Sequence, residues 1–469
     1  MADHSSFNYF AQFEEANPGP VGASIQRLSR DLELPAALVR SQLSKAFCAP
    51  AEISLTAHSG RLRSRRLKLC LLAATTLGAL LMYGRRKTPH KDVLYDTVAN
   101  ERKDVRDLYY RPIMDAMPQL LHQDLPARVS SAYPWDMRFA SFRLKVRVTA
   151  GAVRALFDSL AGNDTEKSLS LQIYFVGALT ALQASAHFRG RKAKVIVSAA
   201  DVYWGGITYA IAKRETGAHI VLLQQFIAHG GRNRDDYGRC ADHYFVLNSA
   251  QPSLMPYSYF GEHHVVGDVS LMAKTRRYSQ ASDIDVAFVE AFPNDIPGLC
   301  SAAAFLQLAT SLSQISRENP NLRIAYLPRP RRDDFGQRGL VAKSRMAQLD
   351  EIISRGAFII DAREPSLAIV ARSKVVVVHS STMWMDALGM GKRILVLNSE
   401  RAPSLPNDET SVCVIRQADP VTVKASIDAT LSLSEAEAER FRDAHVVRHE
   451  DPFVPVKKLI GSLLAHWPA

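Results

Sequence analysis

Cysteine is scarce in this chain, with five among 469 residues. None of the five forms a C-x-x-C pair, and they are scattered as Cys48, Cys70, Cys240, Cys300 and Cys413. Such spacing excludes a disulfide framework, a zinc knuckle and a redox dithiol. We therefore expect reduced thiols and a cytoplasmic setting.

Acidic residues are missing from one stretch of the chain. Residues 61–91 hold nine basic residues and no acidic one, so they carry +9 of the net charge of +11. The uncharged run inside this stretch, residues 69–84, has 16 residues, fewer than the roughly 17–25 that span a bilayer. Basic residues flank it on both sides, whereas a spanning helix usually has a one-sided excess. We expect 61–91 to form a helix at an anionic membrane surface; a buried helix and a true span are the alternatives.

Several signatures of function are also missing. The rest of the chain is close to neutral, so nucleic acid is not expected as a partner. No Walker A loop, H-E-x-x-H motif, nucleophile elbow or EF-hand is present. We expect neither a metal site nor a bound cofactor.

Length and pattern predict two α/β domains. At about 150 residues per domain, 469 residues predict two or three domains. After residue 91, β-rich runs alternate with helical windows, which is typical of parallel sheets. We predict two doubly wound, Rossmann-like domains, 92–275 and 284–445, separated by a cleft and joined by the polar linker 274–283. A helical segment, 1–60, and a C-terminal helix, 446–469, complete the chain.

The predicted strands are short and apolar. Those of the first domain are Val93–Tyr95, Leu169–Phe175, Val195–Ser198, Ile220–Leu223 and Tyr244–Leu247. Those of the second domain are Asp285–Val289, Leu322–Leu327, Ala357–Ile360, Lys374–His379, Ile394–Asn398 and Val412–Ile415.

The most informative pattern lies at residues 374–398. Four valines lead into a polar group, which is followed by a helical window with one acid; the polar side chains are His379, Ser380, Ser381, Thr382 and Asp386. Hydroxyl residues cap helices, and a helix N-terminus attracts phosphate or carboxylate. The pattern predicts an anion site, and plain capping of a structural helix is the alternative.

This stretch resembles the sugar-nucleotide motif of GT-B glycosyltransferases, S-S-T-x-x-x-E-A-x-x-x-G-K-P-V. The resemblance implies donor binding by residues 379–382 and 386, with hydroxyls at the phosphates and the acid at the ribose. Asp386 stands where the family has Glu, and Arg393 stands where it has Pro.

Arginines follow the predicted strand 322–327. A guanidinium can bind phosphate oxygens through two hydrogen bonds. The turn resembles the K-P-H-P or R-x-H-P turn of polysaccharide glycosyltransferases, with Arg329 before Pro330 and no histidine. We assign Arg329 and Arg331 to donor binding, with a solvated basic turn as the alternative.

An acid and an imidazole follow neighbouring strands of the first domain. Asp201 comes after strand 195–198, and His229 comes after strand 220–223. Either side chain can take a proton from an acceptor hydroxyl. We name both as candidate catalytic bases; a helix cap and a loop hydrogen bond are the alternatives.

Residues 91–95 and 241–268 resemble the first and the closing sections of the N-terminal domain of surface-carbohydrate glycosyltransferases, the latter being a strand that ends in V-G-D. The resemblance covers about 65–465. It implies a metal-independent bacterial enzyme of capsule or lipopolysaccharide synthesis. Such an enzyme moves sugar from a nucleotide-sugar onto a growing polysaccharide or a lipid-linked glycan at the inner membrane face. A GT-B-like sugar-nucleotide epimerase and a non-catalytic polysaccharide-assembly protein are the alternatives.

Overall fold

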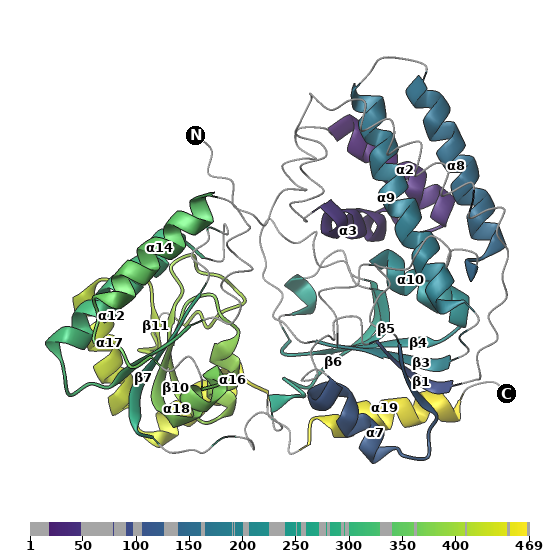
Figure 1. Cartoon of the computed structure of the whole chain (residues 1–469). Coiled ribbons are helices and arrows are strands. Elements are labelled where there is room, and N and C mark those ends of the chain that lie inside the picture. Colours follow the sequence, from purple (N-terminus) through teal and green to yellow (C-terminus); the bar gives the residue numbers. More distant parts are fainter. Residues whose placement is uncertain are drawn as a thin grey trace.

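The computed structural model contains two parallel β-sheets, each covered by helices (Figure 1). No helix among its described residues is long and apolar enough to cross a bilayer. The described residues are 18–47, 78, 91–96, 106–125, 139–160, 165–189, 191, 193–199, 206–224, 240–249, 251–254, 259–271, 278, 282–291, 295, 300–328, 340–360, 364–408, 410–447 and 451–466.

The first sheet has the order β2-β1-β3-β4-β5-β6, with every pair parallel. Its strands are β1 (Lys91–Asp96), β2 (His122–Leu125), β3 (Ala193–Ser198), β4 (His219–Leu223), β5 (Cys240–Val246) and β6 (Tyr259–Val265). Side chains alternate between the two faces, so Ile196 packs beneath α10 (Gly206–Thr216) while Val195 packs toward α7 (Arg111–Ala116). Burial on both faces explains the nearly unbroken apolar sequence of the central strands.

The second sheet has the order β11-β10-β9-β7-β8, again with every pair parallel. Its strands are β7 (Ile284–Val289), β8 (Ile324–Leu327), β9 (Ser373–Val378), β10 (Arg393–Leu397) and β11 (Val414–Ile415). One face carries α12 (Ala302–Glu318), α14 (Leu340–Ser354) and α17 (Pro420–Ser432), and the other carries α15 (Ser366–Arg372) and α16 (Met383–Gly389). The predicted pair of Rossmann-like α/β units is confirmed.

Four further helices form a layer above α10 (Figure 1): α2 (Pro18–Leu32), α3 (Ala36–Phe47), α8 (Phe142–Leu160) and α9 (Thr165–Phe188). Leu28 of α2 and Val39 of α3 are fully buried within it. The Tyr174 hydroxyl of α9 donates to Asp31 Oδ2 of α2 at 2.8 Å. The predicted N-terminal helices therefore exist, and they belong to the core of this layer rather than lying apart from the body.

The predicted strand Leu169–Phe175 is wrong, because these residues lie inside α9. Both Leu171 and Phe175 are 1% exposed, since α9 packs against α2, α8 and α10. A helix buried on all sides is apolar around its whole circumference. A short apolar window from such a helix has the same pattern as a buried strand.

Two smaller differences concern short strands. The predicted strand Ala357–Ile360 is wrong, because Ile359 makes only an isolated bridge to Ala325. Strand β2 was not predicted, because its sequence, His-Gln-Asp-Leu, has no apolar run at the edge of the sheet. Most of the basic segment 61–91 and of the linker 274–283 lies outside the described residues. The domain limits and the cleft stay predictions.

The chain connects the two units at two places. After β6, Leu271 packs so closely on Gly389 of α16 that a Cβ at Gly389 would lie 2.2 Å from the leucine side chain. After α18 (Glu435–His445), which packs beside α16, the chain returns to the first sheet as α19 (Phe453–Ala465). Val456 and Ile460 of α19 are fully buried against that sheet.

Candidate functional site

The strand order of the second sheet determines where its ligand site is expected. β8 lies on one side of β7 and β9 on the other. The helices that follow β7 and β9, α12 and α16, cover opposite faces. In doubly wound sheets ligands bind outside the carboxyl ends of the strands at such a switch point. The motif that begins at His379 directly follows β9 and therefore lies at this point.

Ser380, in the turn after β9, has a left-handed backbone conformation, with φ 50°. Such a φ is uncommon outside glycine, and backbone strain of this kind concentrates at functional sites. The side chains of Ser380, Ser381 and Thr382 are all partly exposed. The turn therefore presents three neighbouring hydroxyl residues at the carboxyl edge of the sheet.

The predicted capping of α16 is only partly correct. Ser381 Oγ accepts a hydrogen bond from the Met383 N–H at 3.3 Å. Thr382, the N-cap residue, makes no capping bond through its side chain. Because α16 has only seven residues, its dipole contributes little to anion binding. Any anion at this turn would therefore be bound chiefly by side-chain hydroxyls.

His379 is buried, with 1% of its surface exposed. Its Nδ1 lies 2.9 Å from the Leu397 carbonyl oxygen, and its ring stacks on Phe305 with centroids 5.9 Å apart. A carbonyl only accepts hydrogen bonds, so Nδ1 carries the proton of this ring. Burial lowers the pKa of His379, which keeps the imidazole neutral. The residue anchors the turn to β10, and its contact with a donor stays a prediction.

The motif glycine, Gly391, ends α16 in a left-handed conformation with φ 75°. Its N–H donates to the Leu388 carbonyl, and the Lys392 N–H donates to the Ala387 carbonyl, both at 2.9 Å. The second bond is that of a Schellman turn, which glycine favours. Asp386 lies half-buried on the same helix, and its role at a ribose stays a prediction.

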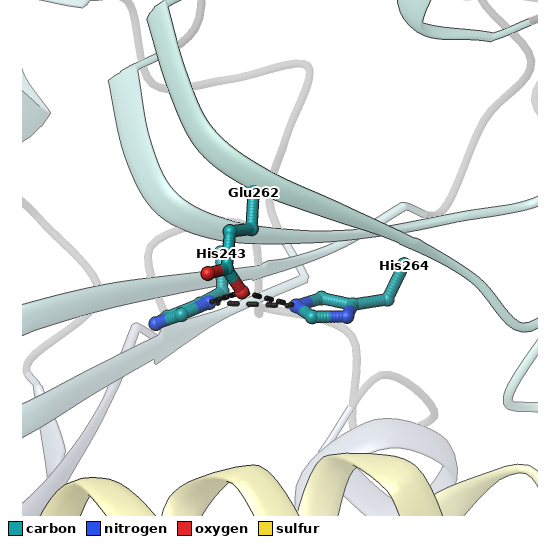
Figure 2. Close-up of side chains that lie close together, drawn as sticks. All are labelled: His243, Glu262 and His264. Atoms are coloured by element: carbon teal, nitrogen blue, oxygen red, sulfur yellow. Dashed lines mark hydrogen bonds and ion pairs between the residues drawn. The ribbon is translucent and has the colours of Figure 1, made fainter.

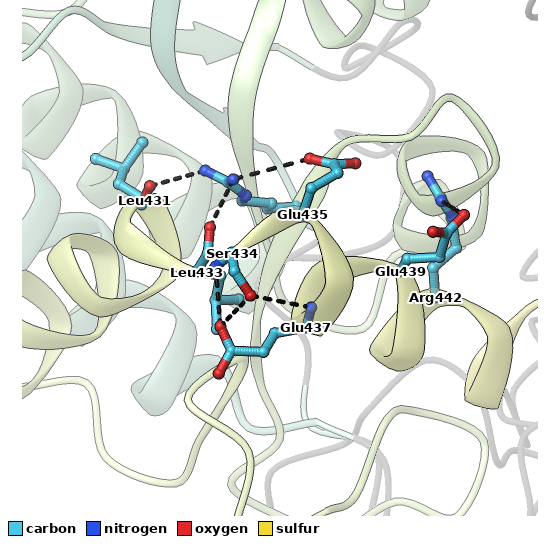
Figure 3. Close-up of polar contacts among 8 residues, drawn as sticks. Leu431, Leu433, Ser434, Glu435, Glu437, Glu439 and Arg442 are labelled. Atoms are coloured by element: carbon cyan, nitrogen blue, oxygen red, sulfur yellow. Dashed lines mark hydrogen bonds and ion pairs between the residues drawn. The ribbon is translucent and has the colours of Figure 1, made fainter.

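Arg393, which replaces the motif proline, has a structural role. Its guanidinium donates to the carbonyl oxygens of Leu431 and Leu433, each at 2.7 Å, at the end of α17. Figure 3 shows Leu431 and Leu433 beside Glu435, whose carboxylate lies 4.0 Å from the guanidinium of Arg393. Carbonyls at a helix C-terminus lack helical partners, and a cation there is stabilising. The difference from the family pattern therefore lies away from the turn at 379–382.

Glu290 is a residue of this edge that sequence reasoning missed. It directly follows β7 and is 4% exposed, and it accepts a hydrogen bond from the Tyr326 hydroxyl of β8. Its N–H donates to the Leu327 carbonyl at 3.0 Å. The signal was an acid directly after a predicted strand; Asp201 was selected by a similar signal, an acid shortly after a strand.

The start of α12, at the same edge, is occupied by groups of the chain itself. Ser301 Oγ accepts from the Ala304 N–H at 3.3 Å, and Asp295 accepts from the Ala302 N–H at 2.8 Å. Because a carboxylate already lies at this helix N-terminus, a phosphate is less favoured there.

Four predicted site residues, Asp201, His229, Arg329 and Arg331, lie outside the described residues. The strands before them are present: β3 ends at Ser198, β4 at Leu223 and β8 at Leu327. Their roles stay predictions.

No family model and no curated protein matches this chain. Several solved structures are similar at low identity. The wall teichoic acid polymerase TagF is 8% identical, with a TM-score of 0.44 over 87% of this chain and 99% of that one. A UDP-forming α,α-trehalose-phosphate synthase from Burkholderia xenovorans is 11% identical, with a TM-score of 0.38 over 78% and 86%. A structure assigned as a UDP-N-acetylglucosamine 2-epimerase from Listeria monocytogenes is 10% identical, with a TM-score of 0.44 over 81% and 97%.

Proposed function

We propose that this chain is a GT-B-like glycosyltransferase that moves sugar from a nucleotide-sugar onto a growing surface polysaccharide or lipid-linked glycan. The observation that carries the proposal is the turn at 379–382. A strained Ser380 and two further hydroxyl residues stand at the switch point of a doubly wound sheet. Asp386 follows on α16 at the spacing of the sugar-nucleotide motif.

The transfer needs two kinds of group. The leaving nucleotide carries the negative charge that develops as the sugar departs, and hydroxyl and guanidinium donors stabilise such charge. Ser381, Arg329 and Arg331 would supply these donors. An acceptor hydroxyl needs a base, for which Asp201 and His229 are the candidates. The donor would then lie on the second sheet and the acceptor on the first.

The exposed apolar side chains of α8 favour an acceptor that is bound to the membrane at its inner face. Phe142, Val146 and Phe157 are 57%, 43% and 67% exposed. At 100° per residue, these three side chains fall on one stripe of the helix. The exposed Arg143, which lies 3.5 Å from Glu33, and Arg154 are on the same helix. This helix lies at the outer side of the helical layer (Figure 1). Apolar side chains with arginines beside them are typical of helices that lie on an anionic membrane surface.

The test is nucleotide binding followed by product analysis. The melting temperature of the full chain should rise with one of CDP, CMP, GDP and UDP. A ligand at a concentration of 100 times its Kd stabilises the folded protein by about 2.7 kcal/mol. With the matching nucleotide-sugar, the enzyme should elongate a glycan acceptor. Interconversion of the free sugar nucleotide would instead identify an epimerase. Failure of all four nucleotides to shift the melting would contradict the donor site and favour an assembly role.

A further inference from the structure

A cluster of two histidines and a glutamate lies on the first sheet, away from the turn that follows β9. His243 of β5 and Glu262 of β6 are direct partners in the parallel register. His264 lies two residues beyond Glu262 and therefore points to the same face. Figure 2 shows the three side chains converging on one point, with α19 running below them.

The distances between the donor atoms match a metal site. His243 Nδ1 lies 3.4 Å from His264 Nε2 and 3.4 Å from Glu262 Oε2, and His264 Nε2 lies 3.8 Å from the same oxygen. These three distances define a point about 2.1 Å from each atom, within the roughly 2.0–2.2 Å of zinc–nitrogen and zinc–oxygen bonds. Two imidazoles and one carboxylate form a known zinc donor set, in which water takes the fourth position.

The surroundings also suit a metal. The side chain of His243 is 12% exposed and that of His264 is 31% exposed, whereas Glu262 is 66% exposed and leaves the site open to solvent. The ring of His264 stacks on Phe245 with centroids 4.7 Å apart, which fixes its orientation.

We propose that His243, Glu262 and His264 bind a divalent transition metal, zinc first, and that the metal ties β6 to β5. β6 ends the first sheet and pairs only with β5 among the described strands, so its place depends on one ladder of hydrogen bonds. A metal bound by both strands adds a second link, just before the segment in which Leu271 packs on Gly389 of α16. Sequence analysis did not identify the cluster, because its signal is the register of two strands whose paired residues, such as His243 and Glu262, are 19 positions apart.

Zinc binding to the full chain tests the proposal. The protein is first dialysed against a chelator, and zinc is then titrated in competition with a chromophoric zinc indicator. We expect one zinc per chain. His243→Ala and His264→Ala should each weaken zinc binding by at least about 100-fold, since even outer-shell partners cost 10–100-fold. His263→Ala is the matched control, because His263 lies between Glu262 and His264 on the same strand and points to the other face.

Zinc should also raise the melting temperature of the wild type and of His263→Ala, but not that of His243→Ala. No uptake by the wild type, or equal zinc affinity in all variants, would overturn the proposal. If a variant fails to fold, the visible absorption spectrum of cobalt(II) bound to the wild type tests the proposal without variants. Intense visible bands of a four-coordinate nitrogen and oxygen site would support the cluster, whereas the pale spectrum of hydrated cobalt would exclude it.

Discussion

The Nδ1 atom of His379 lies 2.9 Å from the carbonyl oxygen of Leu397, so a buried imidazole joins the residue that follows β9 to the last residue of β10. The next residue, Ser380, is the one in the strained conformation. The hydrogen bond thus fixes the residue from which the strained turn begins. A donor bound at this turn would therefore be linked to stability through His379.

Replacement of His379 should change how stability depends on pH. Because burial lowers its pKa in the folded state, the unfolded chain binds a proton more readily below about pH 6.5. The contribution of this residue to stability is complete above that pH and falls as the pH decreases. His379→Gln keeps a donor for Leu397 but cannot titrate. We expect it to be about 1 kcal/mol less stable than the wild type at pH 7.5, with a smaller difference at pH 5.5.

Urea unfolding at the two pH values measures this change. The exposed His263→Gln serves as the control for the loss of a histidine. A difference between wild type and His379→Gln that is the same at both pH values would show that the buried imidazole does not titrate as expected.

Substitutions in the motif should weaken nucleotide binding. Ser381→Ala, Asp386→Asn and Arg329→Ala each remove a group expected at the donor. Hydrogen bonds that involve a charged group contribute about 1.5–3 kcal/mol, so calorimetry should show a Kd at least about 10-fold higher. Ser354→Ala, at the exposed end of α14, is the control. Unchanged affinity in all three motif variants would place the nucleotide elsewhere.

The motif glycine should be needed for stability rather than for chemistry. Gly391→Ala forces an alanine to φ 75°, where left-handed backbone costs about 1–2 kcal/mol. Gly22→Ala in α2 meets no atom within 4 Å and should stabilise by about 0.5–1 kcal/mol. Chemical denaturation compares both with the wild type. Equal stability of Gly391→Ala would mean that α16 can end in another conformation.

The sequence predicted most strands correctly, because central parallel strands are apolar on both faces. Val375–Val378 and Ile394–Val396 are fully buried and read as apolar runs. The same reasoning failed at α9, where burial on all sides removes helical periodicity. Strand β2 was not predicted, because its polar sequence at the edge of the sheet contains no apolar run.

The candidate site was only partly predictable. The sequence located the turn at 379–382, but the left-handed Ser380 depends on tertiary packing that no local pattern encodes. Whether His379 faces solvent or the core depends on its hydrogen bond to Leu397 and its stacking on Phe305, which come from distant segments. The role of Arg393 likewise depends on the end of α17, some 40 residues away.

Membrane binding should depend on both charge and the apolar stripe of α8. Reversal of Arg61, Arg63, Arg65 and Arg66 to glutamate should release the protein from anionic vesicles, since each basic residue near such a surface contributes about 1 kcal/mol. Phe142→Ser combined with Phe157→Ser should weaken the same binding. Val421→Ser, 79% exposed on α17, is the control. Co-sedimentation at low salt measures the effect, and undiminished binding by both sets of variants would exclude an interfacial role for either segment.

Catalysis should depend on one base in the first domain. An acceptor hydroxyl is a poor nucleophile, so an inverting transferase needs a positioned base, and Asp201 and His229 come after β3 and β4 in the sequence. Loss of a general base lowers the rate by about 10²- to 10⁴-fold. We expect Asp201→Asn or His229→Ala to lose transfer while keeping the thermal shift with nucleotide, because the donor is proposed to bind on the other sheet. Near-normal turnover in both variants would instead favour a retaining mechanism or a base from residues 92–111.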